Sequence, residues 1–107
     1  MSETITKTAL RIEPATSSRV HEVDFSNLQF GRMFGDHMFE MIFENGAWGE
    51  PTVKPYGTIE IAPAMNVFHY GQAVFEGMKA FYGDEKTINI FRPEDHHALF
   101  NRSCRSI

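Results

Sequence analysis

The sequence predicts an α+β fold, built mainly from antiparallel sheet with a flanking helix. Three observations support this prediction. Short segments of alternating apolar side chains occupy the middle of the chain, turn residues separate them, and a helical pattern follows only near the end. Strands and helices do not alternate along the chain, as they would in a parallel sheet.

The segment from His37 to Glu44 carries the clearest strand pattern. Phe39 and Phe43 fall on one face of such a strand, and Ile42 falls on the other. Asn45-Gly46 then supplies turn chemistry, because both residues tolerate positive φ. The apparent loop after this turn is longer than a tight two-residue connection.

Five shorter strands are expected, of which the first would be an edge strand: residues 8–12, 52–54, 57–61, 78–82 and 87–91. A turn at 83–86 joins the last two. Residues 66–77 show no clear period. Within them, Gly71 and Gly77 suggest a special backbone conformation or a close approach.

A helix is expected to begin at Arg92-Pro93, since proline suits a first turn and the acidic Glu94 and Asp95 suit the positive end of the helix dipole. One face of this helix collects His96, Leu99, Phe100, Ser103 and Ile107. No stop signal ends the pattern, which predicts that the chain is cut short.

The composition is that of a globular protein. With 107 residues, 42% of them apolar, the chain should form one domain or part of one, with one modest core. We expect a lead-in segment over residues 1–28 and an incomplete small domain over 29–107. A net charge of −4 argues against nonspecific nucleic-acid binding.

Several features favour a cytoplasmic location. The single Cys104 rules out an internal disulfide and fits a reducing compartment. The start of the chain resembles no secretory signal, and no apolar stretch approaches the length of a membrane helix.

Generic catalytic motifs give no reaction. The sequence holds no phosphate-binding glycine loop and no zinc pattern. The adjacent His96 and His97 would point apart on a helix, so we predict no metal site. Lys79 could form a Schiff base, but strand alternation favours solvent exposure for it. Cys104 lacks a basic partner and is expected to be inert.

Two interpretations remain open for the aromatic residues. Tyr70, next to His69 and Gly71, could donate a hydrogen bond in a pocket, or it could pack with its hydroxyl bonded to backbone. The phenylalanines could line an apolar pocket, although most phenylalanines belong to a core.

Four blocks, in order and at matching spacing, carry a family resemblance. They run from Phe34 to Phe39, Gly46 to Gly49, His69 to Phe81 and Phe91 to Pro93. From about Arg19 to Ile107 the chain resembles branched-chain amino acid aminotransferases, which are fold-type IV pyridoxal-phosphate enzymes. The resemblance implies part of the small N-terminal domain of a two-domain subunit.

The resemblance also implies a function in amino-acid biosynthesis. Family members transfer an amino group between Leu, Ile or Val and 2-oxoglutarate, and they work as homodimers. Pyridoxal 5'-phosphate is held there as a Schiff base on a lysine of the later domain. That lysine has no counterpart here, and Lys79 matches a different position. We therefore expect the chain alone to be inactive and assign it no catalytic residue.

Carried over by position, Phe34 and Phe75 resemble walls of the substrate pocket. Tyr70 resembles a residue that reaches the neighbouring subunit's site. Leu99 departs from the family, which has an arginine there to grip the cofactor phosphate. Arg102, one turn later, is the remaining candidate for the cofactor-binding role.

Two alternatives stay open beside this interpretation. The chain could derive from another fold-type IV enzyme, such as a D-amino acid aminotransferase or an aminodeoxychorismate lyase. It could also be a noncatalytic dimerisation module, which Leu99 and the missing lysine would suit.

Overall fold

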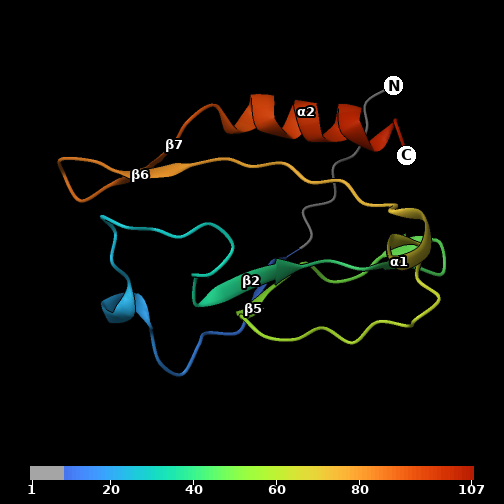
Figure 1. The fold of residues 1–107 in the computed structure, drawn as a ribbon, viewed down its shortest axis with the longest axis horizontal. Helices are drawn as coiled ribbons and strands as arrows, with labels where there is room; N and C mark the ends of the chain where they lie inside the picture. Colours follow the sequence, from blue (N-terminus) through green and yellow to red (C-terminus); the bar gives the residue numbers. More distant parts are fainter. Residues whose placement is uncertain (1–8) are drawn as a thin grey trace. The chain divides into compact units, whose positions relative to one another are not determined.

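A computed structural model describes residues 9–107. The chain divides into two compact units, Met1–Ile59 and Glu60–Ile107. Small sheets and two α-helices make up the described part (Figure 1), which confirms the predicted α+β class. The predicted boundary between residues 28 and 29 stays a prediction.

The first unit contains a three-stranded sheet in the order β1-β5-β2. These strands are β1 (Arg11–Ile12), β5 (Thr52–Pro55) and β2 (His37–Glu40). Figure 1 shows β2 and β5 side by side; they pair antiparallel, whereas β1 pairs parallel to β5. A short 3-10 helix, η1 (Val20–Glu22), lies between β1 and β2 in the chain. The predicted edge strand thus shrinks to β1, and Thr8 lies outside the described residues.

The predicted strand from His37 to Glu44 breaks into two. After β2 ends, β3 (Phe43–Glu44) pairs with β4 (Ala47–Trp48) in a separate hairpin. Asn45 and Gly46 have φ of 52° and 79°, so they form a tight two-residue turn. The longer loop expected here was wrong, because two successive positive φ values reverse the chain at once.

The second unit contains the hairpin of β6 (Ala80–Tyr82) and β7 (Ile88–Ile90). Both predicted strands are confirmed in shortened form. The turn between them begins at Gly83, whose N–H donates to the Thr87 carbonyl at 2.7 Å. A Cβ on Gly83 would lie 2.8 Å from the Thr87 Oγ1 atom, which explains glycine at this position.

The predictions for the part of the chain between β5 and β6 were only partly correct. Residues 57–61 form no strand, because they pair with no other strand within residues 9–107. The aperiodic region contains a short helix, α1 (Asn66–Tyr70), which ends at Gly71 with φ of 60°. Gly71 therefore has the expected special conformation. Gly77 does not show the expected close approach, because no atom lies within 4 Å of a Cβ built on it.

The predicted terminal helix is α2 (Pro93–Cys104). Pro93 occupies the first turn together with two acidic residues, as expected. Of the predicted inner face, His96 and Ser103 are half-buried, whereas Ile107 lies beyond the helix end.

No apolar side chain of residues 9–107 is buried. Phe30 is fully exposed, and Phe75 is 92% exposed. The predicted core is therefore wrong for the part that the structure describes. Strands of two to four residues in single sheets cannot enclose apolar side chains, since a core needs two packed layers.

Neither α-helix in residues 9–107 is long and apolar enough to cross a bilayer.

Candidate functional site

Phe34 lies in the loop that leads into β2, and its ring stacks on the ring of Tyr56. The ring centroids are 4.9 Å apart and the planes differ by 7°. Tyr56 directly follows β5, and its backbone N–H donates to the Asp36 carbonyl at 2.9 Å. Tyr56, directly after β5, therefore holds residues 34–36 by both a ring contact and a backbone hydrogen bond. We call residues 34–36 the Phe34 loop.

A second set of bonds holds the same loop from the lead-in segment. The Asp36 carboxylate accepts from Ser18 Oγ at 2.6 Å and from the Arg19 backbone N–H at 2.8 Å. The Arg19 Nη2 atom donates to the carbonyls of Phe34 and Gly35 at 3.3 and 3.1 Å. We call these four bonds the Arg19–Asp36 clasp.

The clasp also sets the ionisation of Asp36. The hydrogen bond from Ser18, followed by the one from the Arg19 N–H, lowers the pKa of Asp36 below its usual 3.8. Only 22% of the Asp36 side chain and 46% of the Arg19 side chain are exposed. The carboxylate is therefore charged, and bonded, at neutral pH.

A hollow of about 260 Å³ opens beside the Phe34 ring. The apolar side chains along its wall are Val20, Val23, Phe25, Leu28 and Met33. Such a wall suits aliphatic groups, because it offers them apolar contact and few hydrogen-bonding groups.

The other two predicted substrate residues belong to the second unit. Tyr70 is the last residue of α1, is 82% exposed, and lines a hollow of about 480 Å³ with Asn66 and Gln72. Asn66 Nδ2 donates to Gln72 Oε1 at 2.8 Å. Phe75 lies in the coil between α1 and β6. Phe34 is described within the first unit, and Tyr70 and Phe75 within the second.

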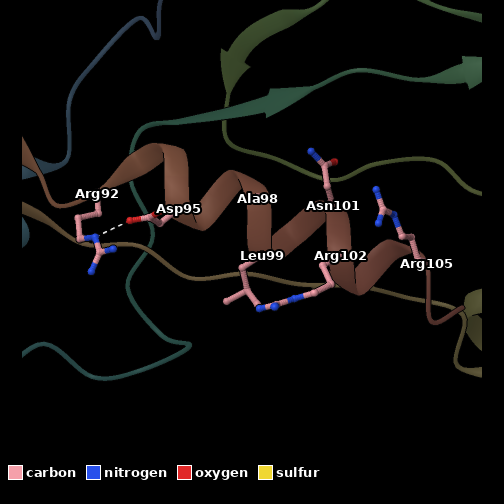
Figure 2. A pocket seen from close by; sticks show the side chains of 7 residues that line it. All are labelled: Arg92, Asp95, Ala98, Leu99, Asn101, Arg102 and Arg105. Atoms are coloured by element: carbon pink, nitrogen blue, oxygen red, sulfur yellow. Dashed lines mark hydrogen bonds and ion pairs between the residues drawn. The ribbon is translucent and has the colours of Figure 1, made fainter.

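One face of α2 forms a wide basic hollow of about 720 Å³ (Figure 2). Its lining comprises Arg92, Asp95, Ala98, Leu99, Asn101, Arg102 and Arg105. Figure 2 shows the Arg102 side chain extending back along the helix toward Leu99. Arg92 is engaged locally, because its Nε atom donates to the Asp95 carboxylate.

The charge on this face suits an anion. Three guanidinium groups stand against the single carboxylate of Asp95. Leu99, at the middle of the face, can donate no hydrogen bond. Arg102 is in the last turn of α2, where the negative end of the helix dipole opposes an anion. The face can therefore attract a phosphate only through its arginines and the Asn101 amide.

The remaining reactive side chains lie apart from this face. Lys79 directly precedes β6 and is exposed, and Lys86 occupies the hairpin turn with φ of 58°. The free Cys104 is exposed at the end of α2. Neither lysine lines the basic hollow.

The two adjacent histidines contact different partners. His96 Nδ1 lies 3.4 Å from the Glu76 carboxylate, and His97 Nε2 lies 3.1 Å from Asn101 Nδ2. Within residues 9–107, no three His, Cys, Asp or Glu residues gather closely enough to hold a metal ion.

Comparison with curated proteins finds clear relatives. A branched-chain-amino-acid transaminase of Bacillus subtilis is 46% identical over 82 residues, 76% of this chain. A second B. subtilis branched-chain-amino-acid aminotransferase is 40% identical over 100 residues, 92% of this chain. The cytosolic branched-chain-amino-acid aminotransferase of Mus musculus is 38% identical over 107 residues, 99% of this chain.

This chain is homologous to branched-chain amino acid aminotransferases. The family resemblance drawn from its motif blocks is thereby confirmed. The chain spans only about a quarter of these relatives, between 23% and 27% of their length. No protein-family model matches it.

Sequence reasoning did not predict two features of the site, the hollow at α2 and the Arg19–Asp36 clasp. Asn101 and Arg105 join Arg102 at the α2 hollow, and the spacing of the two arginines, three residues apart on a helix, could have predicted it. The Arg19–Asp36 clasp joins two residues that are 17 positions apart in the sequence, and no local sequence pattern predicts such a contact.

Proposed function

We propose that this chain is the small-domain portion of a fold-type IV branched-chain aminotransferase. The enzyme would transfer the amino group between Leu, Ile or Val and 2-oxoglutarate. The observation that carries the proposal is the mouse alignment, which runs at 38% identity through 99% of this chain. Because the chain matches only 27% of that relative, we place the Schiff-base lysine outside these residues.

Phe34 is proposed as a wall of the substrate pocket. Its ring, stacked on Tyr56 and set beside an apolar hollow, offers a fixed surface to an aliphatic side chain. Phe75 is proposed as a second wall, and Tyr70 as a residue that reaches a neighbouring subunit. Both side chains are highly exposed, which suits residues that form a site together with another surface. An apolar pocket wall distinguishes two substrates that differ by one methylene group by roughly 1–3 kcal/mol of binding free energy.

Arg102 is proposed to contact the phosphate of pyridoxal 5'-phosphate, with Arg105 beside it. Guanidinium groups bond phosphate through charge-assisted hydrogen bonds, and both residues line the α2 hollow. Leu99 removes a donor from the middle of that hollow, and the helix end opposes the anion. We therefore expect the affinity for phosphate here to be low and to fall as the salt concentration rises. When bound, the cofactor supplies an electron sink for amino transfer.

The decisive test measures cofactor attachment. The chain is mixed with pyridoxal 5'-phosphate, its absorbance is recorded, and it is reduced with borohydride before peptide mass analysis. We expect no stable adduct, or labelling scattered over the lysines. A single reduced adduct on Lys79 or Lys86 would show that the catalytic lysine lies within this chain and would overturn its proposed place.

A second test addresses the reaction. A longer protein that carries this sequence should form glutamate from 2-oxoglutarate when leucine is supplied. Activity with D-alanine or aminodeoxychorismate, without activity on leucine, would instead favour another fold-type IV enzyme.

We further propose a homodimer in the cytoplasm. The name of the mouse relative supports this location, since it is described as cytosolic. A yeast relative is described as mitochondrial, so cell fractionation is the direct check.

Leu99 supports a second candidate function, a noncatalytic dimerisation module. Such a module would keep its apolar surfaces while losing the phosphate contact. A longer product that dimerises but binds no pyridoxal 5'-phosphate would favour the module over the enzyme.

A further inference from the structure

We propose that Arg19 and Asp36 are positioning residues, which fix the Phe34 ring against Tyr56 by tying the lead-in segment to the Phe34 loop. The role of Phe34 in substrate choice rests on the proposed function. The clasp itself rests only on the geometry of the first unit.

Residues 34–36, which form the Phe34 loop, are held from two sides. On one side, Tyr56 donates its N–H to the Asp36 carbonyl, and His37 then pairs with Pro55 in the sheet. On the other side, the Arg19 guanidinium bonds the carbonyls of Phe34 and Gly35. With these two carbonyls held, the backbone that carries the Phe34 ring has little freedom to rotate.

Asp36 holds Arg19 in place for this task. Its two carboxylate oxygens bond Ser18 Oγ and the Arg19 N–H, so the segment bearing the guanidinium is fixed beside the loop. A further bond strengthens the attachment, since the Ala15 N–H donates to His37 Nε2 at 2.9 Å. The lead-in segment therefore acts on the Phe34 loop at several points.

The clasp restrains the position of the Phe34 ring. None of the apolar side chains around it is buried, so packing alone does not dictate where the Phe34 ring lies. Phe34 is 46% exposed, and its ring centroid lies 4.9 Å from that of Tyr56. Directed hydrogen bonds to the neighbouring backbone are the specific restraints on its position.

The test compares Arg19→Ala and Asp36→Ala with the control Asp24→Ala in the 107-residue chain. Asp24 also bonds a serine hydroxyl and a backbone N–H, but both belong to Ser26, within its own turn. The readout is the ring-current displacement of the Tyr56 ring protons in NMR spectra, which a stacked Phe34 ring produces. Ser18→Ala, which removes one bond of the clasp, serves as a milder variant.

We expect a clear displacement in the parent chain and in Asp24→Ala. It should fall by more than half in Arg19→Ala and Asp36→Ala, and fall partly in Ser18→Ala and Arg19→Lys. A parent chain without the displacement, or clasp variants that keep it in full, would overturn the proposal.

A longer, active protein adds a functional readout. There, Arg19→Ala should lower the ratio of kcat/KM for leucine over alanine roughly tenfold, while Arg19→Lys restores part of it. An unchanged ratio in an active protein overturns the positioning role. Absence of any transaminase activity in the parent would count against the proposed function alone, because the NMR result still decides the clasp.

Discussion

Tyr56 contacts the Phe34 loop twice, through its ring and through its backbone N–H. The ring stacks on Phe34 with 7° between the planes, and the N–H bonds the carbonyl of Asp36. One residue, directly after β5, therefore fixes both the side chain and the backbone of the Phe34 loop.

Replacing the Tyr56 ring should release the Phe34 ring. We predict that Tyr56→Leu loses the stacking, which is worth about 0.5–1.5 kcal/mol for an aromatic pair, whereas Tyr56→Phe keeps it. The Phe34 ring resonances measured by NMR should be averaged in the leucine variant only. Equal spectra for the two variants would contradict a stabilising ring contact.

The clasp should weaken in acid. The hydrogen bonds from Ser18 and then Arg19 depress the folded-state pKa of Asp36, so this group stabilises the fold above the unfolded value near 3.8. The contribution is lost as pH falls through the lower folded pKa. Hydrogen exchange of the Arg19 amide, normalised for intrinsic exchange, should therefore accelerate below that value. In Asp36→Asn, with no group left to titrate, this change should vanish.

Gly46 should resist substitution because of its backbone alone. No atom lies within 4 Å of a Cβ built on Gly46 or on Gly57, but only Gly46 has a left-handed φ, of 79°. We expect Gly46→Ala to cost about 1–2 kcal/mol of hairpin stability and Gly57→Ala much less. Protection of the Gly49 N–H, which bonds the Ile42 carbonyl at 2.7 Å, reports on this hairpin. Equal protection in both variants would argue against conformational strain.

Restoring a donor at position 99 should strengthen phosphate binding. We predict that Leu99→Arg lowers the Kd for pyridoxal 5'-phosphate about tenfold, since a charged hydrogen bond contributes about 1.5–3 kcal/mol. Phe100→Arg adds the same charge on α2 outside the lining of the basic hollow, at a side chain that is also 38% exposed, and is the matched control. Calorimetric titrations should show a larger gain for Leu99→Arg. A similar gain in both would indicate a net-charge effect.

The exposed apolar side chains should drive association. Phe30 and Phe75 are both more than 90% exposed, and residues 9–107 bury no apolar side chain. We expect the 107-residue chain to associate in sedimentation experiments and to bind an apolar dye. A monomer that unfolds cooperatively on heating would refute this expectation.

Local chemistry explains which elements the sequence could predict. Pro93 and the acidic residues after it specify the start of α2, and Asn45-Gly46 specifies a turn by its tolerance of positive φ. The β6–β7 strands follow from alternation around a glycine turn. Residues 57–61 alternate as well, but a strand also requires a pairing partner, which alternation cannot supply.

For the candidate site, too, the sequence predicted some features and the tertiary structure decided others. The sequence by itself determined the α+β class, the family resemblance and the residue types available, including the leucine at position 99. Tertiary structure alone decided that Phe34 stacks on Tyr56 and that Arg19 reaches the carbonyls of residues 34 and 35. The physical reason is that turns and helix starts depend on neighbouring residues. Stacking and clasp bonds instead depend on where the chain returns after 15 or more residues.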